Sequence, residues 1–243
     1  MEYPRLSNAP IREAIIDIRV KHSPDFKISE FRSLQSKLSD DFPKMEDRKA
    51  ITSQVRFEAG KTDIIEEKNE LDAIIFKSKD NTEVLQFKKN GLTFNKLEPY
   101  SEWQDVIEKA KKAWTLYKEI SNPLFVTRIA TRYINNILLP INSDLDEYLQ
   151  NSPKIPSNGP SLFTNSLTRN TLAEPEKDIY VHLTQAIETK ENNVAIIIDI
   201  DAFKGKQFDL GKDNFWEDFE ELREMKNKLF FSSLTEKAIN KYK

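Results

Sequence analysis

Two aspartates in one apolar segment have the type and spacing that could hold a metal ion. Asp199 and Asp201 stand two residues apart in the run IIIDIDAF, so in a strand both carboxylates lie on one face. Such pairs can bind Mg²⁺. The sequence offers no place for a third ligand, and aspartates near strand ends more often turn towards solvent. We therefore predict no metal and no cofactor, and name Asp199 and Asp201 as the candidates if a metal does bind.

A second set of charged residues could bind an anion or form ion pairs. In the run LFVTRIATRYINNILL (124–139), alternation puts Arg128, Arg132 and Asn136 on one face. Because an unpaired buried guanidinium is very costly, that face is half-solvated or carries an ion-pair network. Glu13 and Asp17 likewise share a face of the run IREAIIDIRV (11–20).

If these two segments are neighbouring strands, the acids and the guanidiniums can form charge-assisted pairs. We favour a structural network, with Arg132 pairing with Glu13 or Asp17, because buried ionic groups are best known for fixing register. A ligand- or partner-binding site made by Arg128, Arg132, Asn136, Glu13 and Asp17 is the alternative, and catalysis is the third reading.

Signals for other chemistries are missing from the sequence. The chain has two histidines, His22 and His182, without a partner at metal-ligand or triad spacing, and no cysteine. Its five glycines never form the phosphate-binding loops of the Rossmann or P-loop kinds. We therefore predict no catalytic residue.

Composition indicates an ordinary globular protein. With 37 basic and 40 acidic residues the formal net charge is −3, so no global basic field attracts nucleic acid. No apolar run approaches the roughly 20 residues that cross a bilayer, and the start MEYPRLSNAP does not look like a signal peptide. We expect a cytoplasmic protein without a membrane partner.

The elements that must position these residues follow from periodicity. Helical spacing of Arg128, Arg132 and Asn135 also allows a helix at 124–139, but Val, Thr, Ile and Tyr dominate and prolines bracket the run, which favours a strand. In the first half we predict a strand at 11–20, a helix capped by Ser29, a charged loop before residue 71, and a hairpin at Asn90-Gly91. The other predicted elements of that half are strands at 51–59, 71–78, 83–89 and 92–97, and a long helix from a Ser101–Gln104 capping box to about residue 120.

The second half repeats this order. We predict the strand 124–139, a short helix capped by Ser143, a mobile proline-rich loop at 152–160, and strands at 161–172, 178–188 and 193–203. Helices at about 213–230 and near Thr235 complete it. The expected fold is α+β, with closely packed halves 1–121 and 122–243 forming one antiparallel sheet with helices on one face. That is the topology of TATA-binding-protein-like saddles; helix-grip and duplicated ferredoxin-like arrangements are the alternatives.

Four segments together resemble a bacterial family catalogued as "sporadically distributed". They are PIREAIIDIRV, VTRIATRYINNILLP, the YSEW before the long helix, and FFSSLTEKAI. Members of that family share a Pro-Ile-x-Glu-Ala strand, an Arg-x-x-x-Arg-Tyr-x-Asn strand and a late Phe-x-x-x-Thr segment. The resemblance implies an uncharacterised family without an assigned activity, whose patchy distribution suits genes carried in mobile operons, including antiviral defence loci.

These observations favour a non-catalytic binding or assembly module. Its partner would be an operon neighbour, a second copy of the chain, or a small anionic ligand. An enzyme acting on phosphate-containing or nucleotide substrates is the alternative, with Arg128 and Arg132 as clamps and Asp199 and Asp201 holding metal. Local nucleic-acid binding on the uncovered face of the sheet is the third.

Overall fold

The computed structural model describes residues 3–58, 61–154, 158–159, 164–211 and 215–243, without the side chains of residues 51–69. The predicted proline-rich loop at 152–160 lies partly outside this range. Nine strands are described: β1 (Ile11–Lys21), β2 (Lys44–Glu58), β3 (Lys61–Lys77), β4 (Glu83–Lys88), β5 (Gly91–Leu97), β6 (Phe125–Pro140), β7 (Asn165–Glu174), β8 (Ile179–Thr189) and β9 (Asn193–Lys204). The described helices are η1 (Ile28–Leu34), α1 (Gln35–Leu38), α2 (Trp103–Ser121), η2 (Leu145–Glu147), η3 (Pro175–Lys177), α3 (Phe215–Ser233) and α4 (Glu236–Asn240).

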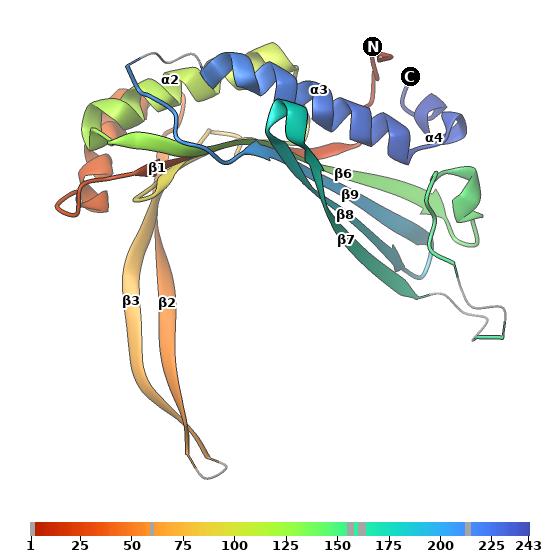
Figure 1. Ribbon diagram of the computed structural model, residues 1–243, viewed down its shortest axis with the longest axis horizontal. Coiled ribbons are helices and arrows are strands. Elements are labelled where there is room, and N and C mark those ends of the chain that lie inside the picture. The colour runs from red at the N-terminus through yellow and green to blue at the C-terminus, as the bar shows by residue number, and fades with distance from the viewer. Residues whose placement is uncertain (1–2, 59–60, 155–157, 160–163, 212–214) are drawn as a thin grey trace.

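The strands form one antiparallel sheet in the order β2-β3-β4-β5-β1-β6-β9-β8-β7. The protein is therefore an α+β fold, as the sequence predicts. The sheet is bent into an arch, α2 and α3 lie along its outer side, and the inner side is open (Figure 1). The hairpin of β2 and β3 projects from one end of the arch as an arm. No described helix is long and apolar enough to cross a lipid bilayer.

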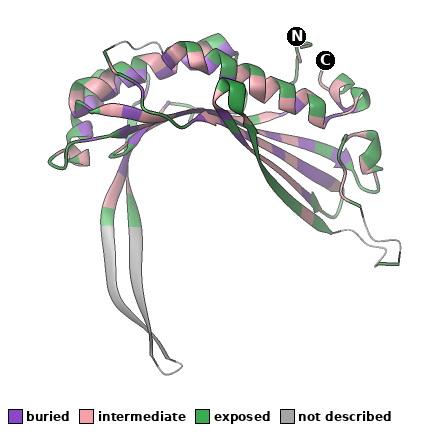
Figure 2. Cartoon of the chain, viewed as in Figure 1, coloured by how far each residue is buried: buried purple, intermediate pink, exposed green. Residues whose placement is uncertain are grey.

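The hydrophobic core lies between the sheet and the two long helices. Alternate residues of β1, such as Ile16 and Ile18, are buried on the side of the helices. The apolar stripe of α2 includes Trp114, whose ring meets the ring of Phe215 on α3 edge-on at 5.8 Å. Figure 2 shows buried residues on the strands beneath the helices, whereas the edge strand β7 is largely exposed.

Several helix starts differ from the sequence prediction, because the residue at the N-cap is decided by local contacts. Ser29 does not cap an α-helix; it lies inside the 3₁₀ helix η1, which begins after Lys27 and continues as the four-residue α1. Ser101 is not the cap of α2 either, since Glu102 holds that position and the Ser101 hydroxyl donates to Asp105. Asp144, rather than Ser143, caps the short helix η2 by accepting from the backbone N–H of Asp146.

The arm is longer than its sequence pattern predicts. The charged segment before residue 71 is not a loop, because β3 begins at Lys61 and pairs with β2 along its length. Charged residues are frequent in this segment, and charge at a sheet edge discourages pairing with other chains.

The hairpin between β4 and β5 is predicted correctly, but Asn90 and Gly91 are not its two central residues. Lys88 pairs with Gly91, so Lys89 and Asn90 are the two linking residues. Asn90 does not have a positive φ, whereas Gly91 has a φ of 151°. A methyl group on Gly91 would lie 2.1 Å from the carbonyl oxygen of Ile18 on β1. Glycine is therefore needed here for the close approach of β1 and β5.

We expect Gly91→Ala to lower the free energy of unfolding by at least about 2 kcal/mol, because the added carbon meets rigid backbone at an unfavourable φ. The matched control is Gly205→Ala, where nothing lies within 4 Å of the added carbon. That variant should stay within about 0.5 kcal/mol of the wild type. Chemical denaturation of both variants measures the difference, and equal stability would contradict the proposed close approach.

His22 is buried where β1 ends beside α2. Its Nε2 lies 2.7 Å from the hydroxyl of Tyr117, which in turn donates to the carbonyl oxygen of Lys88. Burial lowers the pKa of His22 below its ordinary value of 6.5, with a smaller contribution from Lys89, while a hydrogen bond with the Ser121 backbone acts in the opposite direction. The folded protein therefore resists protonation of this ring.

Stability should depend on pH through His22 in a definite direction. Below the ordinary pKa, the unfolded chain binds a proton that the folded protein does not, so the free energy of unfolding falls as pH falls until the folded-state pKa is passed. We expect the stability advantage of the wild type over His22→Gln to shrink from about pH 7.5 to about pH 5.5. Urea unfolding at each pH tests this, and a constant difference would count against it.

Candidate functional site

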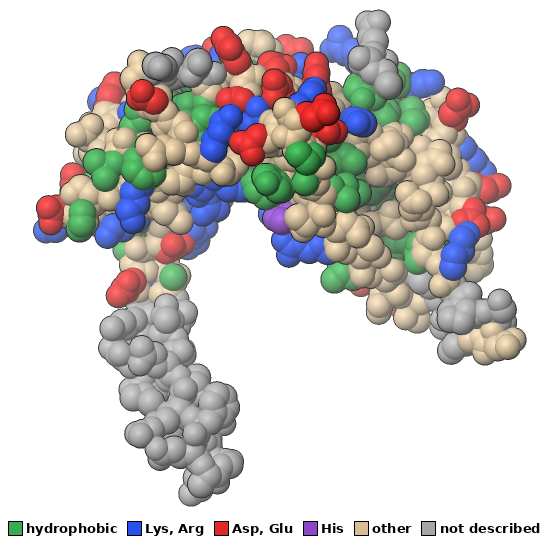
Figure 3. All heavy atoms as spheres, viewed as in Figure 1, with side chains coloured by type: hydrophobic (Ala, Val, Ile, Leu, Met, Phe, Trp, Pro, Cys, Tyr) green, Lys and Arg blue, Asp and Glu red, His purple; other side chains and the backbone are tan. Residues whose placement is uncertain are grey.

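The candidate site lies on the open inner face of the arch, where β5, β1, β6 and β9 are neighbours. A hollow of about 520 Å³ occupies the middle of this face. Its lining comes from β1, β4, β5, β6 and β9 and consists of Glu13, Ile15, Asp17, Arg19, Gln86, Lys88, Thr93, Asn95, Arg128, Arg132, Ile134 and Asp201. In Figure 3, lysine and arginine side chains gather along the inner surface of the arch.

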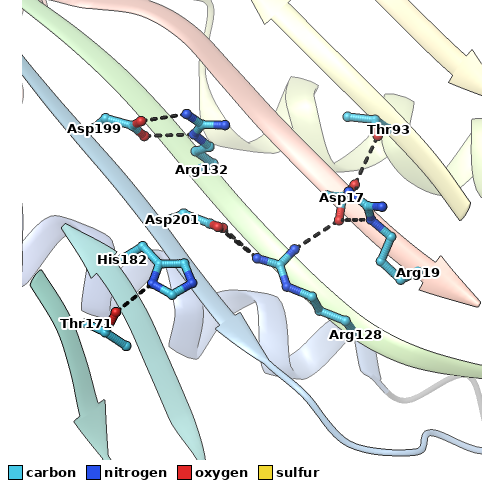
Figure 4. Close-up of polar contacts among 9 residues, drawn as sticks. All are labelled: Asp17, Arg19, Thr93, Arg128, Arg132, Thr171, His182, Asp199 and Asp201. Carbon is cyan, nitrogen blue, oxygen red and sulfur yellow. Dashed lines mark hydrogen bonds and ion pairs between the residues drawn. The ribbon is translucent and has the colours of Figure 1, made fainter. Parts of the chain in front are cut away.

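Arg128 connects three strands across this face (Figure 4). From β6, its Nη1 donates to Asp17 on β1 at 2.9 Å, and its Nη2 donates to both oxygens of Asp201 on β9 at 2.8 and 2.9 Å. The guanidinium carbon lies 4.4 Å from the ring centre of Phe203. The same Asp17 carboxylate accepts from Arg19 and from the hydroxyl of Thr93. The predicted sharing of a face by Asp17 and Arg128 is thus confirmed.

Arg132 does not pair with Glu13 or Asp17, so that part of the prediction is wrong. Its Nε and Nη2 donate to the two oxygens of Asp199 at 2.8 and 2.6 Å. Arg132 stands beside Asp201 in the register of β6 and β9, and Asp199 is its diagonal neighbour on the same face. The hydrogen bonds with Asp199 raise the pKa of Arg132 above its ordinary value.

The two remaining candidates have other surroundings. Glu13 accepts a hydrogen bond of 2.5 Å from the side chain of Asn95 on β5. Asn136 does not line the hollow; its backbone N–H donates to the carbonyl oxygen of Pro10. The side-chain oxygen of Asn136 is buried and has no hydrogen-bond partner among the described residues.

Asp199 and Asp201 lie on one face of β9, as predicted, but each of them binds an arginine. Among the residues that the structure describes, no group of three or more His, Asp or Glu side chains could hold a metal ion. His182 on β8 is the neighbour of Asp201 on β9. Its Nδ1 lies 3.0 Å from the hydroxyl of Thr171, and its ring contacts the ring of Phe203. The chemistry available here is hydrogen bonding and charge pairing.

The guanidiniums lie further out than the carboxylates that bind them. The Arg132 side chain is 44% exposed and that of Asp199 only 15%; for Arg128 and Asp17 the values are 25% and 10%. Lys88 adds another cation, whose Nζ donates to Thr93 and whose pKa is lowered by burial. A partner entering the hollow therefore meets hydrogen-bond donors first, although the ion pairs nearly balance the charge.

Sequence reasoning missed the apolar part of this face. Leu138, Leu167 and Tyr180 are exposed large side chains, and strand alternation places all three on the inner side of β6, β7 and β8. The Tyr180 ring stacks on Phe203 at 5.8 Å. The signal was available in the alternation of the last three strands, since Leu167 shares a face with Arg169 and Thr171.

The chain was compared with protein-family models, with curated proteins and with solved structures, and it matches none of them.

The two arginines make a matched pair for testing the network. Arg128→Met leaves Asp17 and Asp201 without their shared partner in a half-buried position, so we expect a loss of about 2–4 kcal/mol in the free energy of unfolding. Arg132→Met removes a more exposed pair and should cost about 0–1 kcal/mol. Thermal and urea unfolding measure both.

A double variant separates loss of the pair from loss of packing. Adding Asp201→Asn to Arg128→Met should restore part of the stability, because it removes the carboxylate that was left unpaired. Equal losses for the two arginine variants, or no recovery in the double variant, would contradict the central role of Arg128.

Proposed function

We propose that this chain is a non-catalytic binding module that holds a partner protein on the open inner face of its sheet. The observation that carries the proposal is the composition of that face. Paired arginines and carboxylates occupy its centre, and exposed apolar side chains stand on the wall formed by β6 to β8. Arginine, tyrosine and apolar side chains are the types enriched in protein–protein interfaces.

The arrangement supports a rigid docking surface better than an active site. Each described carboxylate of the central group already accepts from a neighbouring side chain, so none is left as a free base or metal ligand. Paired charges also lose less solvation when a partner covers them, because they keep their partners. An enzyme using Arg128 and Arg132 as phosphate clamps would first have to break these bonds.

A specific observation favours nucleic acid as the second candidate partner. Arg132 and Arg128 are more exposed than the carboxylates beneath them, and basic side chains line the inner surface of the arch (Figure 3). Phosphates would meet these donors first. The overall charge of −3 and the existing ion pairs argue against it, because counterion release needs uncompensated cations.

We also infer that the halves 1–121 and 122–243 are two copies of one unit in a TATA-binding-protein-like saddle. Supporting this, the strand order outward from the β1–β6 pair is alike in the two halves, apart from one extra strand, β2, in the first: β1 and β6 are adjacent, and each is flanked by the last strand of its own half, β5 or β9. A long helix follows that last strand in both halves. Helix-grip and duplicated ferredoxin-like arrangements are the alternatives.

The same proposal covers the biological setting. The chain would belong to the bacterial "sporadically distributed" family, which four of its segments resemble; two of these four segments contain β1 and β6, the neighbouring strands at the centre of the sheet. A docking surface built from those motifs suits a protein that works with an operon neighbour, in the cytoplasm and in a setting such as antiviral defence.

Two leucines on opposite faces of the edge strand β7 test the docking surface. Leu167 is 74% exposed on the inner side, whereas Leu172 is 39% exposed on the side of the helices. We expect Leu167→Asp to reduce partner recovery at least about tenfold, because a charge placed in a desolvated interface is costly. Leu172→Asp should leave recovery unchanged. The measurement is affinity purification of the tagged chain from its source cells, with the recovered proteins quantified.

Three results would count against the proposal. These are equal recovery with the two leucine variants, recovery of no protein by the wild type, and a complex with DNA or RNA whose affinity falls steeply with salt. The last would favour the second candidate, and Arg132→Met should then reduce the slope of affinity against salt.

A further inference from the structure

A second cavity lies on the opposite side of the sheet, among the helices. It has a volume of about 410 Å³ and is enclosed by residues 3–11, the segment that leads into α2, β6 and α3. Its lining is unusually aromatic and includes Tyr3, Tyr100, Trp103, Tyr133, Phe230 and Phe231. Because it is reached from the helix side, a molecule inside it would not touch the open face.

Lys226 of α3 lies in this cavity without a counter-ion. Its Nζ lies 3.8 Å from the ring centre of Tyr133, and in the described part of the chain it forms no ion pair and no hydrogen bond. Burial lowers the pKa of Lys226 to about 7, and the nearby Arg223 contributes in the same direction. A bound anion would stabilise the charged form of an amine that lies among aromatic rings and beside a second cation.

The carboxylate that pairs with Arg223 already has a second hydrogen bond. Glu220 accepts from the indole N–H of Trp103 at 2.5 Å and from Arg223 at 3.1 Å, and it is not part of the cavity wall. The guanidinium of Arg223 lies 5.5 Å from the Trp103 ring. Arg5 adds a third cation to the wall, and Glu102 is the one carboxylate among the described residues that line it. Cations therefore outnumber carboxylates among the described residues of the wall, although Arg223 is paired with Glu220 outside it.

The rest of the wall suits the flat apolar part of a ligand. Tyr3 stacks on Phe231 at 4.9 Å, and Tyr100 meets Tyr133 edge-on at 5.7 Å. The two hydroxyls of Tyr100 and Tyr133 are 3.1 Å apart and can orient a polar group. Sites for small molecules commonly combine mainly apolar walls with a few polar groups that fix orientation.

We propose that this cavity binds a small organic anion, a carboxylate or phosphate attached to an aromatic or other flat apolar body, with Lys226 and Arg223 as the residues that hold the acidic group. This site is separate from the docking surface and does not depend on it. The body lies against Trp103, Tyr100 and Phe230, and the acidic group reaches the amine beside Tyr133.

The charge of Lys226 sets the pH dependence of binding. The titratable or charged groups that face it are Arg223 on α3, Tyr133 on β6, Tyr100 and Glu102 before α2, and Tyr3 and Arg5 in the N-terminal segment. Burial raises the pKa values of Tyr100 and Tyr133, so these hydroxyls stay protonated near neutral pH. The amine carries its proton at pH 6 and loses it by pH 9, so affinity for an anion should fall over this range.

The test uses benzoate and benzenesulfonate, whose charge does not change between pH 6 and pH 9, in isothermal titration calorimetry. We expect binding with a Kd below about 10 mM at pH 6 and at least about tenfold weaker binding at pH 9. Benzamide, a neutral match for benzoate, and acetate, which lacks the ring, should each bind at least about tenfold more weakly than benzoate. Binding at pH 8 should take up a proton, seen by comparing buffers of different ionisation enthalpy.

Matched variants on α3 identify the amine. Lys226→Met keeps the apolar stem and removes the partly buried amine, so it should fold, and it should lose both the affinity and its pH dependence. Lys228→Met, on the exposed side of the same helix, should behave as the wild type. The pH series on the wild type stands without any variant.

The proposal is overturned if neither benzoate nor benzenesulfonate binds the wild type, if affinity does not fall with pH, or if Lys226→Met binds as well as the wild type. Leu167→Asp should leave benzoate binding unchanged, and Lys226→Met should leave partner recovery unchanged. Failure of one proposal is therefore distinguishable from failure of the other.

Discussion

The ion pairs of Arg128 are the interaction on which the centre of the sheet depends. β6 lies between β1 and β9, and Arg128 binds a carboxylate on each of them. Alternate residues of these strands face either the helices or the open side, so a slip of one residue would move charges under the helices. The hydrophobic side therefore requires the register that the ionic side makes specific. The same strand register thus determines both the packing of the core and the arrangement of charges on the open face.

This division makes β6 the strand that serves both sides of the protein. Arg132 faces the open hollow, whereas the next residue, Tyr133, is buried beside Lys226 in the aromatic cavity. The two environments differ in whether their cations are paired with carboxylates. On the open face Arg128 and Arg132 are each paired with a carboxylate, and in the cavity the amine of Lys226 has none among the described residues. Satisfied charges suit a surface that keeps its shape, and an unsatisfied charge suits a space that receives a ligand.

The sequence predicted what depends on local periodicity. Alternation identified β1, β6 and β9 and the face that carries Asp17, Arg128 and Asp199, because side-chain direction in a strand follows from position alone. The partner of Arg132 could not be predicted, since it depends on β9 lying beside β6, which alternation does not encode. Helix caps were also misplaced, because the N-cap positions predicted for Ser29, Ser101 and Ser143 are held by the nearby residues Lys27, Glu102 and Asp144.

The sequence contains a signal that could have predicted the aromatic cavity. Lys226 stands four residues after Leu222 and four before Phe230, so it interrupts the apolar stripe that packs α3 against the sheet. A lysine in such a stripe is either at the margin or beside a space. Four chain segments enclose that space, and only the folded structure brings them together.

The central position of β1 also decides when the protein can fold. Arg19 pairs with Gly91 on one edge of β1 and with Arg128 on the other, 109 residues further along the chain. As the chain leaves the ribosome, β1 has one edge without a partner until most of β6 has been made. Through that interval the backbone N–H and C=O groups along this edge lack their β6 partners. The unpaired edge of β1 is therefore most open to pairing with other chains just before β6 emerges.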